Sequence, residues 1–258
     1  MRKGLLYILF ALLLAVPNFL NIHLQTPAEK GFDWEEFDAP LANQLRSIPQ
    51  IKSYTDSILQ SKQIAKGSLN HAEILAQTLR KRFYHGYAYY SLRENWIAAV
   101  CGKLFWEDLG AIVIPEDLLH YPMAACSQQE IVLMKLFTMN GIDYRKILFN
   151  HHFASEARIN EAWYYFDTNL EPNFPNKKRE SLATFIDRNQ MKEMYAGRLD
   201  VNKLDSILGA PKYGAINQYP APRAKLFHQV TQFFSHWFWL VFLIAGCIKL
   251  YNAKKTIE

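Results

Sequence analysis

Cysteine is scarce in this sequence: its 258 residues contain three, and no two of them form a Cys-x-x-Cys pair. Small scaffolds built on disulfides need more cysteines, and structural zinc modules usually present closely spaced pairs. The sequence therefore argues against both classes. Cys101 and Cys126 could pair in an oxidising compartment, but we expect Cys126 to be a free thiol.

A concentrated basic stretch is also missing from the middle of the chain. The formal net charge is +5, from 29 basic and 24 acidic residues. Several of the surplus cations flank apolar segments near the two ends, namely Arg2, Lys3, Lys249, Lys254 and Lys255. Cations in such positions are typical of membrane-topology signals, so the sequence predicts no nucleic-acid partner.

What the chain does have is a long apolar run near each end. The first, Gly4 to Val16, is unbroken and directly follows two cations. A cleaved signal peptide has the same charge and core pattern, but no clear small-x-small cleavage site follows Val16. We therefore favour an uncleaved anchor helix over a signal peptide.

The second apolar run, Phe233 to Ile248, approaches the roughly 20 residues that span a bilayer core once Val230 is included. Aromatic side chains crowd its beginning, as in the belt that membrane proteins place at headgroup level. A buried core helix is the alternative, but few core helices carry so many aromatics in series. The sequence therefore predicts a lipid bilayer as one partner.

Both cationic flanks belong on the cytoplasmic side of an inner or plasma membrane. Residues 22–228 would then lie on the periplasmic or extracellular side, with both termini in the cytoplasm. The predicted organisation is an anchor helix at 1–24, a linker and helical lead-in at 25–66, a central domain at 67–215, a linker at 216–229, a transmembrane helix at 230–251 and a cationic tail at 252–258.

Helical patterns dominate the first part of the central region. Apolar residues recur at helical spacing from Leu41 to Leu59, with a break expected at Pro49. The segment Ser68 to Tyr84 predicts an amphipathic helix with Ser68 as its N-cap. A further helix is expected from Arg93 to Phe105.

The most informative helix is predicted from Ser127 to Asn140. Its apolar residues leave almost no polar face, which indicates a buried helix. Ser127 and Glu130 have the spacing of a capping box at its start. Gly141 tolerates the left-handed conformation that ends a helix.

Three strand-like runs follow, at Tyr144 to Phe149, His152 to Arg158 and Ala162 to Phe166. With a turn at 158–161 they predict an antiparallel meander. Further helices are expected at 180–195 and 201–208, and a loop then leads to the second apolar run. The predicted fold class is α+β, with a buried helix packed on an antiparallel sheet and two transmembrane helices in addition.

Cys126 stands at the start of the predicted buried helix. Unpaired amides and the helix dipole favour an anion there, so they stabilise a thiolate, which is the nucleophilic form of cysteine. The same amides can donate hydrogen bonds to a developing oxyanion. One cysteine at a helix start is common, so the prediction of a site depends on its neighbours.

His152 and Asp167 could complete a set around this thiol. His152 opens a strand that can return beside the helix start, where an imidazole takes the thiol proton and later protonates the leaving group. The preceding residue, His151, should point to the opposite face of that strand. Asp167 ends the next strand, and a hairpin would bring it close enough to His152 to fix the imidazole tautomer.

With this set the sequence resembles the transglutaminase-like superfamily, whose fold is related to papain. The resemblance covers about residues 70 to 172 and is carried by Ala125-Cys126, then Asn140-Gly141-Ile142, then His152-Phe153-Ala154-Ser155-Glu156-Ala157, then Trp163-Tyr164-Tyr165-Phe166-Asp167. It implies a papain/transglutaminase-like core at 67–215 with Cys126 as nucleophile, His152 as base and acid, and Asp167 as orienter. Glu156 also matches a family position, and we assign it no chemical role.

The resemblance implies a membrane-anchored thiol hydrolase or acyltransferase that acts on a peptide or protein substrate and needs no cofactor. We expect a peptidase or amidase in preference to a cross-linking enzyme. Ala124 and His151 stand where the family commonly has glycine, and both add a side chain near Cys126. These differences keep a second hypothesis open, an inactive binding or scaffold module of an assembly with other membrane proteins.

A metal site is a further alternative, because His120, His151, His152 and Asp167 could gather in the fold. No ligand pair has the helical His-x-x-x-His spacing, however, and two adjacent histidines in a strand point apart. The sequence therefore predicts no metal.

Overall fold

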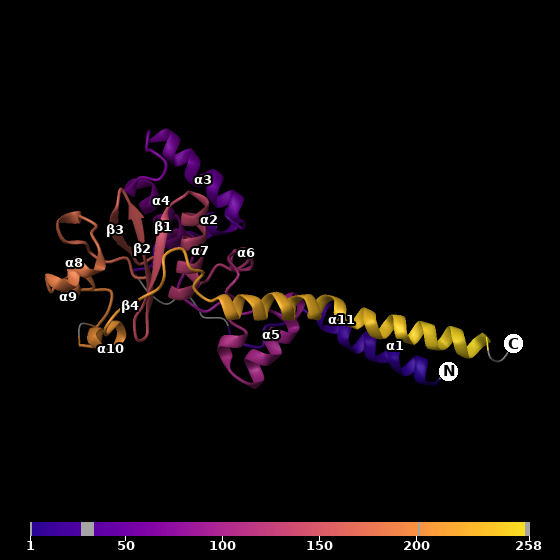
Figure 1. The fold of residues 1–258 in the computed structure, drawn as a ribbon. Coiled ribbons are helices and arrows are strands. Elements are labelled where there is room, and N and C mark those ends of the chain that lie inside the picture. Colours follow the sequence, from indigo (N-terminus) through magenta and orange to yellow (C-terminus); the bar gives the residue numbers. More distant parts are fainter. Residues whose placement is uncertain (1, 27–33, 201, 256–258) are drawn as a thin grey trace. The chain divides into compact units, whose positions relative to one another are not determined.

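The computed structural model describes residues 2–26, 34–200 and 202–255. Within these residues the fold is α+β, with eleven α-helices and a four-stranded antiparallel sheet (Figure 1). The chain divides into two compact units, of which unit 1 comprises Met1–Pro27, Tyr89–Val113 and Ala221–Glu258, and unit 2 comprises Ala28–Ala88 and Ile114–Pro220. The finer domain boundaries expected from the sequence stay a prediction.

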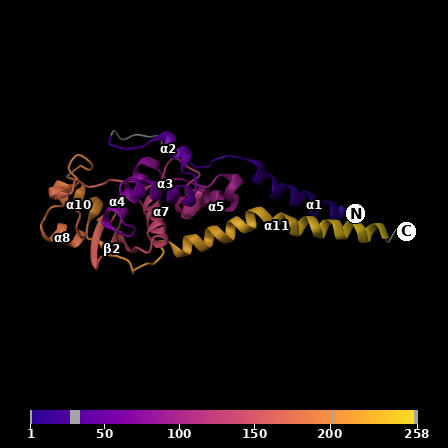
Figure 2. The ribbon, with the colours of Figure 1, turned by 90° about the horizontal axis from the view of Figure 1, so that it is seen from above.

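Unit 1 consists of helices from three separate parts of the chain. They are α1 (Arg2–Ala15) with the 3-10 turn η1 (Val16–Phe19), α5 (Leu92–Leu104) with η2 (Glu107–Leu109), and α11 (Pro222–Lys255). The segments Arg2–Phe19 and Pro222–Lys255 are long and apolar enough to cross a membrane. They lie side by side, with the start of α1 and the end of α11 at the same end of the pair (Figures 1 and 2).

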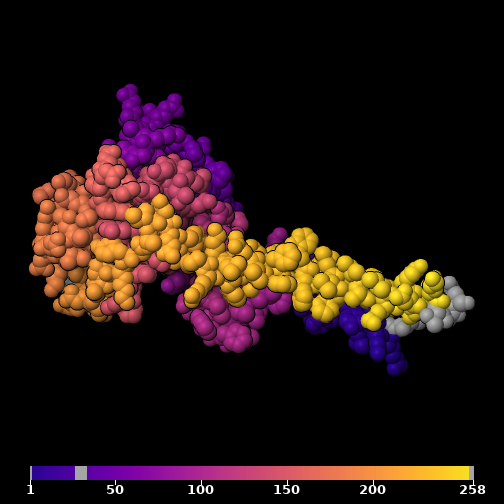
Figure 3. Space-filling view, in the orientation of Figure 1, coloured from indigo at the N-terminus to yellow at the C-terminus, as the bar shows by residue number. Residues whose placement is uncertain are grey.

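Close approach of the two backbones holds α1 against α11. A Cβ atom on Gly246 would lie 2.9 Å from the carbonyl oxygen of Gly4, so neither position has room for a side chain. Small residues allow such approach between helices in lipid, where packing and not hydrophobic burial drives association. Farther along the pair, Phe10 and Phe242 meet edge to face with ring centroids 4.7 Å apart. The α1 surface is visible against that of α11 in Figure 3.

The remaining helix of unit 1, α5, is not regular along its whole length. Asn95 has φ −161° and ψ 78°, and its side chain donates to Thr231 Oγ1 at 2.9 Å and accepts from Ser235 Oγ at 3.1 Å. The sequence predicts one continuous helix from Arg93 to Phe105. The interruption escapes that prediction because it is set by polar partners on α11, far away in sequence.

Unit 2 contains the other helices and the sheet. Its helices are α2 (Ala39–Gln44), α3 (Ile48–Ser61), α4 (Leu69–Arg82), α6 (Pro115–Leu118), α7 (Cys126–Met139), α8 (Leu182–Asp187), α9 (Met191–Met194) and α10 (Leu204–Leu208), with a 3-10 turn η3 at Pro175–Lys177. Ser68 caps α4 by accepting from the His71 amide, which confirms the predicted N-cap. Pro49 lies in the first turn of α3, where a missing amide costs no intrahelical bond.

The sheet has the order β3-β2-β1-β4 and is antiparallel throughout. Its strands are β1 (Asp143–Leu148), β2 (Phe153–Ile159), β3 (Ala162–Phe166) and β4 (Lys212–Tyr213). The three-stranded meander is confirmed, with a two-residue turn at Asn160 and Glu161 whose φ values are 49° and 64°. The sequence missed β4, because two residues within a loop carry no strand periodicity.

Helix α7 packs against β1 and β2, and Phe137 on it meets Phe166 of β3 with centroids 5.4 Å apart. This confirms a buried helix on an antiparallel sheet. A second buried cluster joins the strands to the short helices that follow them, and includes Ile147, Ala154, Tyr165, Leu182, Phe185, Tyr195 and Leu204. The sheet is therefore covered on both faces, which explains why β2 is almost entirely buried.

The predicted capping box at Ser127 and Glu130 is wrong. Helix α7 begins one residue earlier, at Cys126, and its N-cap is Ala125. The Gln128 Oε1 atom accepts from the amides of Ala125 at 3.1 Å and Ala88 at 2.9 Å, so a glutamine in the first turn supplies the acceptor. Glu130 is fully buried and bonds elsewhere. Sequence spacing alone does not reveal which residue begins the helix.

Candidate functional site

A cavity of about 350 Å³ opens in unit 2 at the start of α7. We call it the thiol cleft, and its lining residues are Trp34, His85, Cys126, His151, His152, Asn169, Leu170, Arg198, Leu199 and Ile207. Two of the three predicted catalytic residues, Cys126 and His152, thus face one cavity. The third, Asp167, is completely buried beside His152.

The structure brings His152 and Asp167 into direct contact. Their Nε2 and Oδ2 atoms are 2.6 Å apart, and both side chains are buried. Continuing the β2–β3 register by one residue would place Asp167 opposite Ala154, two positions from His152. The predicted hairpin is therefore present, and the two side chains meet diagonally across its open end.

His152 carries a positive charge at neutral pH. Burial by itself would lower the pKa of His152, but the charge and hydrogen bond of Asp167 outweigh it, and the interaction with Cys126 adds to them. Together they raise the pKa of His152 to about 10. Because Asp167 occupies Nε2, the ring nitrogen left for the Cys126 thiol is Nδ1. An imidazolium at this position stabilises a neighbouring thiolate.

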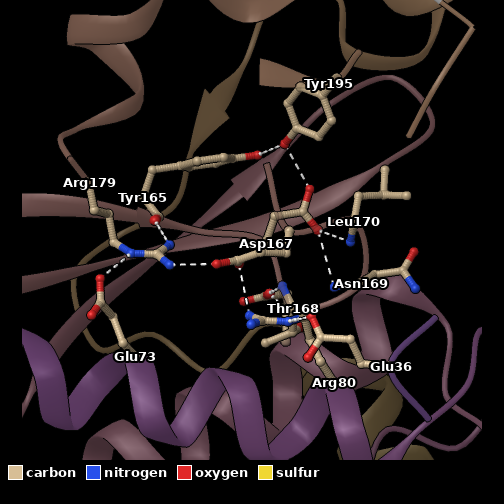
Figure 4. Close-up of polar contacts among 12 residues, drawn as sticks. Glu36, Glu73, Arg80, Tyr165, Asp167, Thr168, Asn169, Leu170, Arg179 and Tyr195 are labelled. Carbon is tan, nitrogen blue, oxygen red and sulfur yellow. Dashed lines mark hydrogen bonds and ion pairs between the residues drawn. The ribbon is translucent and has the colours of Figure 1, made fainter. Parts of the chain in front are cut away.

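Asp167 is held in place by four donors. Its Oδ1 atom accepts from the amides of Leu170 at 2.9 Å and Asn169 at 3.2 Å. Its Oδ2 atom accepts from His152 and from the Tyr195 hydroxyl, the latter at 2.8 Å (Figure 4). Although burial would raise the pKa of Asp167, the His152 charge and these hydrogen bonds hold it below its ordinary value. The carboxylate is therefore ionised and fixed in orientation.

Two tyrosines extend this network behind Asp167. Burial and the charge of Asp167 raise the pKa of Tyr195 well above its ordinary value, so its hydroxyl keeps its proton. That proton is donated to the carboxylate, and the Tyr165 hydroxyl, 2.5 Å away, must then donate to Tyr195. Tyr195 was not predicted from the sequence, because it lies 28 positions from its partner, at the end of a short helix.

Glu130 ties the segment after Asp167 to helix α7. Its Oε1 atom accepts from the Thr168 amide at 2.8 Å and the Thr168 hydroxyl at 2.7 Å. Burial raises the pKa of Glu130 to about 7 with a contribution from the Asp167 charge, against the nearby Ser155 hydroxyl and the hydrogen bonds from Thr168. One buried carboxyl thus connects the helix that carries Cys126 to the strand end that carries Asp167.

An arginine and a glutamate secure the other side of the same segment. Arg179 donates to the Tyr165 carbonyl at 2.6 Å and pairs with Glu171 at 2.8 Å (Figure 4). Glu171 also pairs with Arg80 on α4 at 2.9 Å. Because the residues on both sides of Asp167 are anchored, the carboxylate has little freedom to leave His152.

The approach to Cys126 is fixed by Arg82, at the end of α4. This arginine is buried, and it donates to the carbonyl oxygens of Leu45, Leu119 and Tyr121 at 2.7 to 2.8 Å. Burial lowers its pKa to about 10, so it remains charged at neutral pH. It therefore holds the segment that leads into the start of α7.

Glu156, which matched a family position without a role, lies outside the cleft lining. It is fully buried, pairs with Arg145 at 2.6 Å and accepts from the Leu182 amide at 2.7 Å. These contacts join β2 to β1 and to the start of α8. Its contribution is to the packing of the sheet.

His151 and His152 both lie at the cleft, and the expectation that their side chains point to opposite faces stays a prediction. Neither residue lies within β2, which begins at Phe153, so the alternation of a strand does not apply to them. His151 is exposed and lines the cleft, whereas Ala124 is fully buried and is not a lining residue. Of the two positions that differ from the family pattern, His151 borders the cavity and Ala124 does not.

Cys126 is a free thiol, as are Cys101 and Cys247. Among the described residues, no group of three or more His, Cys, Asp or Glu side chains could hold a metal ion. His85, Trp34 and Arg198 also line the cleft, although the sequence did not predict them there. They come from segments that carry no recognisable motif and reach the cleft only through the fold.

Comparison with known proteins adds no relative. No family model, no curated protein and no solved structure matches this chain.

Proposed function

We propose that this protein is a membrane-anchored, transglutaminase-like thiol enzyme that cleaves or transfers amide or acyl groups outside the cytoplasm. Cys126 is the nucleophile, His152 the base and acid, and Asp167 the orienter. The observation that carries the proposal is His152, buried with its Nε2 atom 2.6 Å from Asp167 and interacting with the thiol of Cys126 at a cavity wall. A thiol at the start of a helix packed on the hairpin with these partners is what the family resemblance implies.

The chemistry follows from these positions. The thiolate attacks the carbonyl carbon of an amide, forming an S–C bond, while amides in the first turn of α7 face the developing oxyanion. The imidazolium of His152 gives its proton to the leaving nitrogen as the C–N bond breaks, which leaves a thioester. The neutral imidazole then takes a proton from water, whose oxygen attacks the thioester to release the acid and the thiolate. A peptidase or amidase needs no further reactant.

An open cleft supports an enzyme over an inactive scaffold. The cavity of about 350 Å³ reaches Cys126, and Ala124 lies outside its lining. Asp167 and its four hydrogen bonds make a preorganised orienter, which a binding module would not need. The same residues do not distinguish hydrolysis from transfer to an amine.

An activated ester tests the proposal directly. With p-nitrophenyl acetate, the full-length protein in detergent should release p-nitrophenolate and carry an acetyl group on Cys126, located by peptide mass spectrometry. Cys126→Ser should reduce release to the background rate. His152→Ala should slow acylation by about 100-fold, because the thiolate loses its cationic partner and the reaction its acid–base group. Cys101, a free thiol in the other unit, is the internal reference.

Two outcomes would contradict this proposal. Release by Cys126→Ser at the wild-type rate would show that another group reacts. Equal acetylation of Cys126 and Cys101 in wild type would show that the cleft does not activate its thiol. Thermal unfolding of each variant distinguishes a chemical effect from loss of fold.

Membrane anchoring is the second part of the proposal. The two exposed apolar helices support it, and so do the cations that flank them. We further propose that the catalytic residues lie outside the cytoplasm and that both chain ends lie inside it. Exposed Trp106, with 65% of its surface accessible in the unit that holds both helices, suits the headgroup level.

A topology reporter checks this orientation. A phosphatase that is active only outside the cytoplasm should be inactive when fused after Glu258. Inserted at Gly67, which lies in an open turn where an added Cβ would meet no atom within 4 Å, it should be active. The reverse pattern would place the catalytic residues in the cytoplasm.

A further inference from the structure

Arg198 lines the thiol cleft and has no ionic partner among the residues that the structure describes. It is partly buried, donates to the Trp34 carbonyl at 3.2 Å, and lies 5.8 Å from the centre of the Trp34 ring. Across the described residues, no carboxylate lies within ion-pairing distance of its guanidinium. The contacts with Trp34 orient the guanidinium and, within the described part of the chain, supply no counter-charge.

Three acidic side chains that line a depression with Arg198 each have another partner. Glu35 accepts from the His85 amide at 2.5 Å, and Glu36 pairs with Arg80 at 3.3 Å. Glu171 pairs with Arg179 and Arg80. These carboxylates share a neighbouring depression with Arg198 and are not lining residues of the thiol cleft.

The other charges of the cleft are balanced. His152 is positive, and Asp167 neutralises it at 2.6 Å. Burial, together with the nearby His152 charge, lowers the pKa of His85, so this imidazole is neutral at pH 7. Of the described residues that line the cleft, none carries a carboxylate. Within this described lining, an anion entering the cleft would meet the Arg198 guanidinium and no carboxylate.

The rest of the lining is largely apolar. Trp34, Leu170, Leu199 and Ile207 contribute hydrocarbon or aromatic surface around the thiol. A guanidinium in such surroundings binds a carboxylate or similar anion more strongly than it would in water, and it can do so through two parallel hydrogen bonds.

We propose that the thiol cleft selects acyl substrates that carry an anionic group together with an apolar one, and that Arg198 binds the anion. This inference rests on the proposed thiol chemistry and adds a substrate class to it. Arg198 determines specificity, while Cys126 and His152 carry out bond breaking. A substrate without the anion would still react at Cys126, but it would gain nothing from Arg198.

Two alkylating reagents of nearly the same size test the inference. Iodoacetate is an anion and iodoacetamide is neutral, so the ratio of their rates at Cys126 reports the electrostatic preference of the cleft. We expect the iodoacetate-to-iodoacetamide ratio to fall about tenfold in Arg198→Met, which keeps a long apolar side chain. Arg198→Lys should retain most of the wild-type ratio. Rates are measured on the full-length protein in detergent by mass spectrometry of the Cys126 peptide.

The controls separate this inference from the proposed function. Lys192→Met removes an exposed cation that does not line the cleft. Its iodoacetate-to-iodoacetamide rate ratio should therefore equal that of wild type. An unchanged iodoacetamide rate in Arg198→Met shows that the cleft is intact. The wild-type ratio in Arg198→Met would overturn the role of Arg198 and leave the thiol chemistry standing. If neither reagent alkylates Cys126 in the wild-type protein, the role of Arg198 and the proposed thiol chemistry are both overturned.

Discussion

Replacing Asp167 by alanine is expected to lower the free energy of unfolding by about 3–5 kcal/mol at pH 7. The change leaves the cationic His152 buried without its counter-charge. It also removes the acceptor of the Tyr195 hydroxyl and of two backbone amides. For a protein of this size such a loss corresponds to a decrease of about 10 °C in Tm, measured by thermal unfolding in detergent.

The pKa shifts of Asp167 and His152 determine the pH range in which their interaction stabilises the fold. The pKa of Asp167 is lowered, so its contribution is present above 3.8 and is lost as the pH falls through the folded value. The pKa of His152 is raised, so its contribution is complete below 6.5 and is lost as the pH rises through about 10. The difference in Tm between wild type and Asp167→Ala should therefore be greatest between those limits and shrink on both sides.

Asp167→Asn is the matched control, because it keeps the shape of the side chain and removes the charge. If its oxygen accepts from the Leu170 amide, its NH₂ group faces the Nε2 atom of His152. That arrangement requires a neutral imidazole with its proton on Nδ1, which cannot accept a proton from the thiol. We expect a smaller loss of stability than in Asp167→Ala, and acylation of Cys126 slowed by about 100-fold or more. Acylation at the wild-type rate would refute the role of orienter.

Replacing Glu130 by glutamine is expected to stabilise the protein at alkaline pH relative to wild type. The pKa of Glu130 is raised from 4.5 to about 7, so the folded state favours the protonated carboxyl. The stabilisation that this provides is complete below pH 4.5 and is lost as the pH rises through 7, a change of about 3 kcal/mol. Glutamine is neutral at every pH and can still accept from Thr168.

Thermal unfolding at two pH values measures this effect. The Tm of Glu130→Gln minus that of wild type should be several degrees more positive at about pH 8.5 than at about pH 5. Glu161→Gln is the control, because Glu161 is highly exposed in the β2–β3 turn. The Tm of Glu161→Gln minus that of wild type should be the same at both pH values. A pH-independent difference for Glu130→Gln would show that the buried carboxyl is not protonated near neutrality.

Local patterns in the sequence were enough to locate the framework of the site. A run of apolar residues placed the buried helix that Cys126 begins, and two short strand-like runs joined by a turn placed the hairpin near His152 and Asp167. Apolar length and flanking cations located the two candidate membrane helices. Each of these depends on neighbours within a few residues, where periodicity and turn chemistry act.

The tertiary structure alone decided which side chains complete the site. Tyr195 reaches Asp167 from 28 positions away, and Glu130 reaches Thr168 from 38. Tyr195 has no distinguishing local pattern, and the capping-box spacing of Glu130 indicated the wrong partner. Position within an element also matters, as His151 and His152 both precede β2 and the alternation of a strand does not apply to them. Local periodicity specifies helices and strands. Hydrogen-bond partners, and the surroundings of a charge such as that of Arg198, depend on which helices and strands pack together.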